Sequence, residues 1–188
     1  MLEYFKILTI THKKTQLKAI GDFALKEAEA LSISQQLQAL RQSFGIAEIL
    51  YLSTCNRVLY CFYDEVELSA TFVQQFFQAI NPTLTPAQIE HAVLQLEGQA
   101  AIQHLFEVAA SVDSLVVGER QILRQLREAY DLCKKWELTG DNIRLLVQQA
   151  VLTAKEIYAR TGIGEKPVSV VSLAFRQMMQ ANLSKEAR

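Results

Sequence analysis

The sequence predicts an α+β fold, in which a small, mostly antiparallel sheet flanked by helices is followed by an all-helical bundle lobe. Short runs of β-branched and aromatic residues with the pattern of strands lie in the first hundred residues, whereas apolar residues at helical spacing fill most of the remainder, including a segment from Val168 that begins with β-branched residues. Only seven Gly and three Pro occur in 188 residues, which also favours helices. We therefore expect an α+β lobe at residues 1–97, a helical-bundle lobe at 98–165 and a further helical segment at 166–188.

In the first lobe, strands are predicted at 4–10, 46–52, 58–63 and, more weakly, 91–96. Helices are predicted at 15–31 with a break at Gly21 and Asp22, at 32–45, and at 69–80. The Phe-rich stripe of the helix at 69–80 has the spacing of a packed face, which favours a role in the core over one in ligand binding. The loop at 81–86 carries a helix-start signal.

In the second lobe, helices are predicted at 99–110 and 119–137. A third helix is expected to begin at a cap formed by residues 139–142 and to stop at 160–164. A last helix is expected at 168–183. The turn between the second and third strands, 53–57, reads Ser-Thr-Cys-Asn-Arg and suggests that these strands form a hairpin.

Cys55 lies in this hairpin turn, two residues before Arg57. Positive charge and N–H donors near sulfur favour the thiolate, which is the form that attacks electrophiles. A small, buried and inert cysteine would explain the same residues, and the stretch alone does not separate the two interpretations. The first strand ends in His12, Lys13 and Lys14, which could bind an anion but are also typical of a solvated strand end.

A second polar cluster precedes and begins the predicted helix at 119–137. Its members are Asp113, Ser114, Glu119, Gln121 and Gln125. Free backbone N–H groups at a helix start can hold a carboxylate, and Ser and Gln side chains can orient an amine or a carbonyl. Ordinary helix capping would explain the two acidic residues but not the two glutamines. His104, on the preceding helix, would by itself be read as a structural histidine.

Composition excludes several classes of protein. Three cysteines without C-x-x-C spacing argue against a disulfide framework or a structural zinc site. The formal net charge of −1 gives no bulk signal for a nucleic-acid partner. No apolar run reaches the length of a membrane span, and the N-terminus lacks the pattern of a secretory signal, so we expect a cytoplasmic protein that does not enter a membrane.

Together, the two clusters resemble the catalytic domain of the glutamyl-tRNA reductase family. The resemblance rests on Leu-Ser-Thr-Cys-Asn-Arg at 52–57, the segment that begins at His104, Asp113-Ser114, Gly118-Glu119-x-Gln121 and Gln125. It covers essentially the whole chain, including the opening strand. The chain departs from the family pattern at Ser111-Val112, Arg120 and Arg124, where the family usually has Gly-Leu, Pro and Gly.

The resemblance implies that Cys55 attacks the ester carbon of glutamyl-tRNA(Glu) to give a thioester. NADPH would then reduce this thioester to glutamate-1-semialdehyde for tetrapyrrole (porphyrin, haem) synthesis. His104 would assist at the carbonyl. The implied glutamate-binding residues are Thr54, Asn56, Arg57, Ser114, Glu119, Arg120, Gln121 and Gln125.

No G-x-G-x-x-G fingerprint occurs in the chain. The resemblance therefore implies a longer protein, with the NADPH-binding domain after Arg188 and 166–188 leading into it. It also implies a homodimer formed through a later C-terminal domain, and glutamate-1-semialdehyde aminomutase as a partner. The alternative function is a non-catalytic tRNA-binding or assembly module of the same fold. A generic cysteine hydrolase ranks last, because no Cys-His-Asn order of a known protease is present.

Overall fold

The computed structural model describes residues 2–28, 31–114 and 117–164. Four strands form one sheet in the order β2-β3-β1-β4, and every neighbouring pair is antiparallel. The strands are β1 (Phe5–Thr11), β2 (Glu48–Thr54), β3 (Arg57–Tyr63) and β4 (Val93–Glu97).

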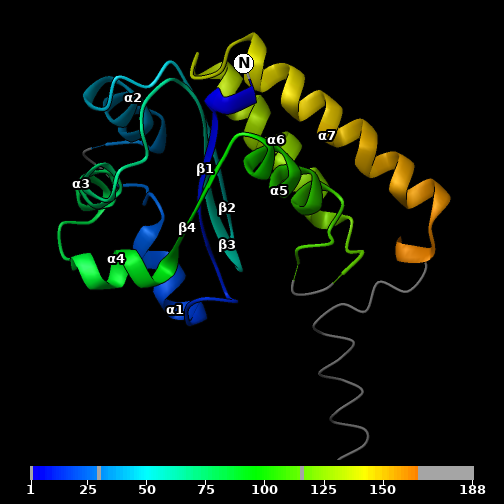
Figure 1. The fold of residues 1–188 in the computed structure, drawn as a ribbon, viewed down its shortest axis with the longest axis horizontal. Coiled ribbons are helices and arrows are strands. Elements are labelled where there is room, and N and C mark those ends of the chain that lie inside the picture. The colour runs from blue at the N-terminus through cyan, green and yellow to red at the C-terminus, as the bar shows by residue number, and fades with distance from the viewer. Residues whose placement is uncertain (1, 29–30, 115–116, 165–188) are drawn as a thin grey trace, which may run out of the picture.

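Helices cover both faces of this sheet (Figure 1): α2, α3 and α4 lie on one side, and α5, α6 and α7 on the other. The helices are α1 (Leu17–Ile20), α2 (Ile33–Ser43), α3 (Ala70–Ile80), α4 (Pro86–Ala92), α5 (Gln99–Ala109), α6 (Gln121–Lys135) and α7 (Asp141–Arg160). Three short 3-10 turns lie at Leu2–Tyr4, Gly21–Phe23 and Gly162–Gly164. In the described part of the chain, no helix is long and apolar enough to cross a membrane.

The predicted α+β class is confirmed, and the predicted strands and most predicted helices are found to within a few residues. The helices that follow β4 do not stand apart from the sheet, since α6 packs against β2 and α5 against β1. The division into lobes at residue 97 stays a prediction. The helix expected at 168–183 lies outside the described residues.

The helical pattern predicted over 15–31, with a break at Gly21 and Asp22, is confirmed only before the break. Leu17–Ile20 is α-helical, a 3-10 turn follows at Gly21–Phe23, and the described residues from 24 to 28 are not helical. Two side chains of the sheet form hydrogen bonds with the backbone here. The Tyr60 hydroxyl donates to the carbonyl of Phe23 at 2.9 Å, and the hydroxyl of Tyr51 accepts from the N–H of Leu25 at 3.0 Å. Two buried tyrosines thus satisfy backbone groups that a helix would pair internally, so the non-helical path costs few hydrogen bonds.

The aromatic stripe of α3 packs into the core, as predicted. Phe76 is fully buried and meets Tyr60 and Phe62 of β3 edge to face, at ring-centroid distances of 5.1 and 5.4 Å. Such pairs stabilise a core beyond the apolar area that they bury. This packing fixes β3, the strand that begins at Arg57.

A buried carboxylate joins β2 to the start of α7. Glu48 is 8% exposed and accepts backbone N–H groups of Gly140 and Ile143 at 2.8 and 2.9 Å, and the side-chain amide of Asn142 at 2.8 Å. The N-cap residue Gly140 has no side chain to do this. The expected cap within residues 139–142 is therefore supplied largely from β2, because a carboxylate satisfies the free N–H groups and opposes the helix dipole.

Candidate active site

Cys55 lies at the tip of the β2–β3 hairpin. Thr54 pairs with Arg57 at the end of the ladder, which leaves Cys55 and Asn56 as a two-residue loop. The Thr54 hydroxyl accepts the backbone N–H of Asn56 at 3.3 Å and donates to the carbonyl of Arg57 at 3.4 Å. The turn is thus held by its own hydroxyl group, and the thiol of Cys55 is exposed.

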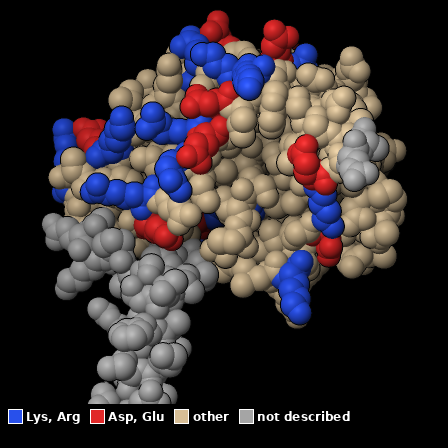
Figure 2. All heavy atoms as spheres, turned by 180° about the vertical axis from the view of Figure 1, so that it is seen from behind, with Lys and Arg blue, Asp and Glu red and all other residues tan. Residues whose placement is uncertain are grey.

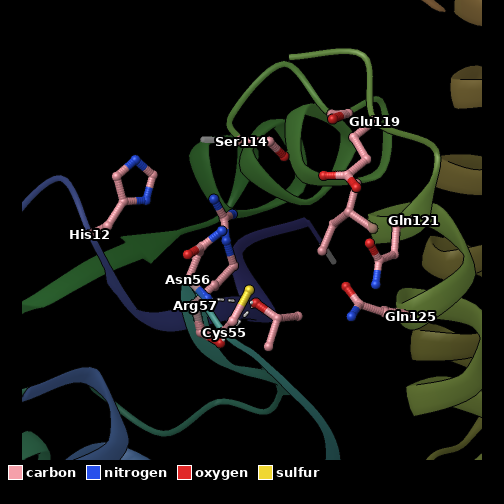
Figure 3. Close-up of a pocket in the computed structure, with 11 residues that line it drawn as sticks. His12, Cys55, Asn56, Arg57, Ser114, Glu119, Gln121 and Gln125 are labelled. Atoms are coloured by element: carbon pink, nitrogen blue, oxygen red, sulfur yellow. Dashed lines mark hydrogen bonds between the residues drawn. The ribbon is translucent and has the colours of Figure 1, made fainter. Parts of the chain in front are cut away.

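The hairpin tip faces the first turn of α6 across a small pocket (Figure 3), where Gln121 and Gln125 point toward the turn from the helix. The pocket is lined by His12, Thr54, Cys55, Asn56, Arg57, Ser111, Ser114, Glu119, Gln121, Ile122 and Gln125. Eight of the sequence-predicted site residues are therefore brought together, although up to seventy positions separate them in the chain. The hairpin turn and the first turn of α6 therefore line one pocket.

Two predicted site residues lie elsewhere. His104 is 7% exposed and is not among the residues that line the pocket; its Nε2 lies 3.4 Å from Nη1 of Arg57. Arg120 is exposed, and its guanidinium carbon lies 5.3 Å from the ring centroid of Tyr158. The structure therefore places His104 behind Arg57, and Arg120 outside the pocket against α7.

Asp113 organises the layer behind the pocket. Nη2 of Arg57 donates to Oδ2 of Asp113 at 2.7 Å and also to its backbone carbonyl. Oδ1 of Asp113 accepts from the ammonium of Lys13, and Nδ1 of His104 lies 3.9 Å from Oδ2. The side chains of Arg57 and Asp113 are only 5% and 12% exposed, so this ion pair is largely shielded from water. Such a pair fixes the orientation of the guanidinium fork.

The charges of this group support one another. Burial raises the pKa of Asp113, but the hydrogen bond from Lys13 and the charge of Arg57 outweigh it and hold the pKa below its usual value. Burial, followed by the charge of Arg57, lowers the pKa of His104. His104 is therefore held as the neutral ring, and Asp113 as the carboxylate, at neutral pH.

The capping interpretation of the second cluster is wrong. Helix α6 begins at Gln121, and its N-cap is Arg120, whose side chain makes no capping hydrogen bond. Asp113 instead reaches Arg57 of β3, and Ser114 and Glu119 line the pocket. These polar side chains are therefore turned toward the hairpin and do not cap the helix.

The other two thiols are buried. Cys61 is fully buried in β3, and burial raises its pKa to about 12. Burial raises the pKa of Cys133 to about 11, and its sulfur accepts the backbone N–H of Tyr51 at 3.5 Å. A buried thiol with a high pKa is a poor nucleophile, so Cys55 is the cysteine suited to covalent chemistry.

Two residues of this region carried weaker sequence signals. Asp113 was grouped with the second cluster, but a contact with Arg57 across 56 positions cannot be read from local spacing. His12 follows the first strand, and only the pairing of β1 beside β3 shows that it reaches the hairpin. Its backbone N–H donates to the carbonyl of Asn56 at 3.4 Å.

Gly118 shapes the loop that carries Glu119. It has a φ of +85°, and a Cβ at this position would lie 1.8 Å from the carbonyl oxygen of Ile163. The loop therefore needs glycine both for its backbone conformation and for its close approach to the backbone after α7.

We expect Gly118→Ala to lower the free energy of unfolding by about 1–3 kcal/mol and to displace Glu119 from the pocket. Gly45→Ala is the matched control, because Gly45 has a φ of +63° but a Cβ there would meet nothing within 4 Å. Urea denaturation of both variants measures the difference. Equal losses of unfolding free energy in the two variants would show that backbone conformation alone accounts for the effect and that the contact with Ile163 contributes nothing.

Comparisons with known proteins point to one family. Residues 8–161 match the family described as glutamyl-tRNAGlu reductase, N-terminal domain. The chain is 38% identical over 171 residues to the glutamyl-tRNA reductase of Alcanivorax borkumensis, and the aligned region covers 88% of this chain and 40% of that protein. It is 38% identical over 169 residues to the glutamyl-tRNA reductase of Chromohalobacter salexigens, with coverage of 89% and 38%.

Among solved structures, the fold is similar to that of the glutamyl-tRNA reductase from Methanopyrus kandleri, with a TM-score of 0.72 and 24% sequence identity. The match covers 93% of this chain and 40% of that structure. The chain thus spans about 40% of the length of the proteins that it matches. Since the family match extends over most of its residues, the chain belongs to the glutamyl-tRNAGlu reductase N-terminal domain family.

Proposed function

We propose that this chain is the catalytic domain of a glutamyl-tRNA reductase and receives glutamate from glutamyl-tRNA as a thioester on Cys55. The observation that carries the proposal is the contrast among the three thiols. Cys55 is exposed at a pocket rich in polar side chains, whereas Cys61 and Cys133 are buried with raised pKa values.

In the proposed reaction, the Cys55 thiolate attacks the carbonyl carbon of the ester that joins glutamate to the terminal ribose. A carbon–sulfur bond forms, the bond from that carbon to the ribose oxygen breaks, and the oxygen leaves as a hydroxyl group after taking up the proton that the thiol lost. The reaction requires the carbonyl carbon to lie roughly 3–3.5 Å from the sulfur. A pocket with the thiol at one side and polar groups of α6 at the other suits the binding of one amino acid.

The lining residues have complementary roles toward glutamate. The carboxylate of Glu119 suits the α-ammonium group, and the amides of Gln121 and Gln125 suit neutral donors and acceptors. Arg57 also lines the pocket, and its contacts with Asp113 and His104 leave further guanidinium N–H groups for the substrate carboxylate. The proposed site is thus charged at its two ends and neutral between them.

His104 is proposed as a positioning residue, because it touches Arg57 and does not line the pocket. A neutral imidazole can accept a hydrogen bond from the guanidinium through Nε2, and its Nδ1–H then points toward Asp113. This proposal differs from the direct role at the carbonyl that the family resemblance implies. Arg120, against Tyr158, is correspondingly proposed to act on the outer surface of the α6–α7 pair.

The described residues do not fit a nicotinamide dinucleotide. The sheet contains only antiparallel pairs within the described ranges, whereas the dinucleotide cradle of the Rossmann type needs parallel strands joined by a Gly-rich turn and a helix. The proposed reaction of this chain therefore ends at the thioester. NADPH, the homodimer, the aminomutase partner and a cytoplasmic location stay predictions for the longer protein that the family implies.

The proposal is tested by incubating the chain with tRNA that carries radiolabelled glutamate. We expect protein-bound label that hydroxylamine releases, as it does from a thioester, and mass spectrometry should place the glutamyl group on the Cys55 peptide. The matched control is the same tRNA(Glu) carrying radiolabelled glutamine, because it differs only in having a neutral amide where glutamate has its side-chain carboxylate. Absence of label would refute acyl transfer, and equal labelling by both substrates would refute recognition of that carboxylate.

A further inference from the structure

A second pocket opens on the other side of His12. Its polar lining residues are His12, Lys13, Lys14, Thr15, Gln16 and His91. No acidic residue is among the described residues that line it. On the face that Figure 2 shows, basic and acidic residues are interspersed, and in the exposed pair of Arg160 with Glu156 the charged groups lie 2.7 Å apart. The second pocket is therefore a local basic feature on a chain whose net charge is close to zero.

His12 forms the wall between this basic pocket and the Cys55 pocket, since it lines both. The backbone of His12 is held to the hairpin by the hydrogen bond to the Asn56 carbonyl. Its Nδ1 is buried and has no hydrogen-bond partner among the described residues. Buried polar atoms normally have a partner, so an unpaired nitrogen between two pockets is a candidate contact for a ligand that passes from one to the other.

The basic groups on the far side of His12 are exposed. The ammonium of Lys13 is paired with the carboxylate of Asp113, but Lys14 and His91 form no ion pair with any described residue. Lys14 therefore offers a cation that does not take part in the network behind Arg57. A cation beside an open pocket, with no carboxylate around it, favours an anionic ligand.

We propose that this basic pocket binds the phosphodiester backbone of the RNA strand whose 3′ end carries the glutamyl ester, an inference that rests on the proposed function. An ester held at Cys55 places its ribose at the mouth of the first pocket, and the chain of phosphates must leave over a neighbouring surface. The basic pocket shares a wall with that mouth. Lysine contacts to phosphate position an RNA strand without reading its sequence.

The openness of the pocket favours a polyanion over a small phosphate. A single phosphate is typically held by converging backbone N–H groups or by a guanidinium fork. Here the available cation is the exposed and flexible side chain of Lys14, since Lys13 is paired with Asp113, and such a single cation suits a backbone that runs across the surface. The phosphates of a nicotinamide dinucleotide are the competing occupant, and the test distinguishes them.

The test uses the full chain and a fluorescent single-stranded RNA that ends in CCA, with binding followed by anisotropy over a range of salt concentrations. Each phosphate neutralised on a single strand contributes about −0.7 to the slope of log K against log salt concentration. We expect Lys14→Gln to weaken binding several-fold at low salt and to reduce this slope by about 0.7. Lys134→Gln removes the same charge from an exposed site at the end of α6 and should leave both unchanged. The rate of Cys55 alkylation by iodoacetamide should be equal in all three proteins.

Equal weakening by the two substitutions would overturn the proposal, because binding would then follow total charge. Displacement of the RNA by NADPH, with the Lys14→Gln change also weakening NADPH binding, would assign the pocket to a dinucleotide and would also overturn it. The proposed function is tested separately, by transfer of glutamate to Cys55. RNA binding that depends on Lys14 without any such transfer would support the RNA-binding role of the basic pocket. The function of the chain would then be that of a tRNA-binding module.

Discussion

Replacing Cys55 with alanine is expected to abolish transfer of glutamate from glutamyl-tRNA to the protein, a loss on the order of 10³-fold or more. The thiol is exposed at the tip of the β2–β3 hairpin and faces the pocket, so no other sulfur can take its place. The measurement is the amount of hydroxylamine-sensitive radiolabel on the protein after incubation with charged tRNA. Circular dichroism should show an unchanged fold, because Cys55 contributes little to the core.

Cys61→Ala and Cys133→Ala are the matched controls. Both side chains are at most 1% exposed, and burial raises their pKa values to about 12 and about 11, so neither supplies thiolate at neutral pH. Their loss should lower stability by leaving small cavities while labelling of the folded protein persists. If Cys61→Ala abolished labelling and remained folded, the assignment of Cys55 as nucleophile would be refuted.

Local patterns in the sequence predicted the hairpin and its thiol well. The apolar run that ends at Leu52 and resumes after Arg57 predicted the two strands with Cys55 in the turn between them, and the structure narrows that turn to the two residues Cys55 and Asn56. The glutamines of α6 were also identifiable, because they did not fit the helix cap that would have explained their acidic neighbours. Both signals depend on residues that are close in the chain.

Features that depend on distant contacts were missed. The helix predicted over 15–31 has suitable spacing, yet hydroxyls of Tyr51 and Tyr60 bind its backbone in another conformation. Glu48 appears as one charge in a strand, and only the fold shows it as the cap of α7. Asp113 is likewise paired with a residue 56 positions away. Tertiary contacts outweigh local preference at each of these positions.

The pairing of Asp113 with Arg57 leads to the second large expected effect. Asp113→Asn keeps the shape of the side chain but removes the negative charge between Arg57, Lys13 and His104. The guanidinium is then left buried without its counter-ion, which costs about 3–5 kcal/mol of unfolding free energy in comparable buried pairs. Because Arg57 also lines the pocket, loss of its orientation should slow transfer of glutamate to Cys55 by about 10- to 100-fold.

Asp141→Asn is the matched control, because it breaks an aspartate–arginine pair at 3.0 Å whose aspartate side chain is 84% exposed. Exposed pairs contribute at most about 1 kcal/mol, so this variant should keep its stability and its labelling rate. Asp113→Glu restores the charge with one more methylene, and it should recover stability more fully than the rate. Urea denaturation and labelling rates at saturating glutamyl-tRNA measure both quantities. A fully active Asp113→Asn protein would show that the pair stabilises the fold without orienting Arg57 for the substrate, whereas a slow but stable one would show that its contribution is to the geometry of the pocket.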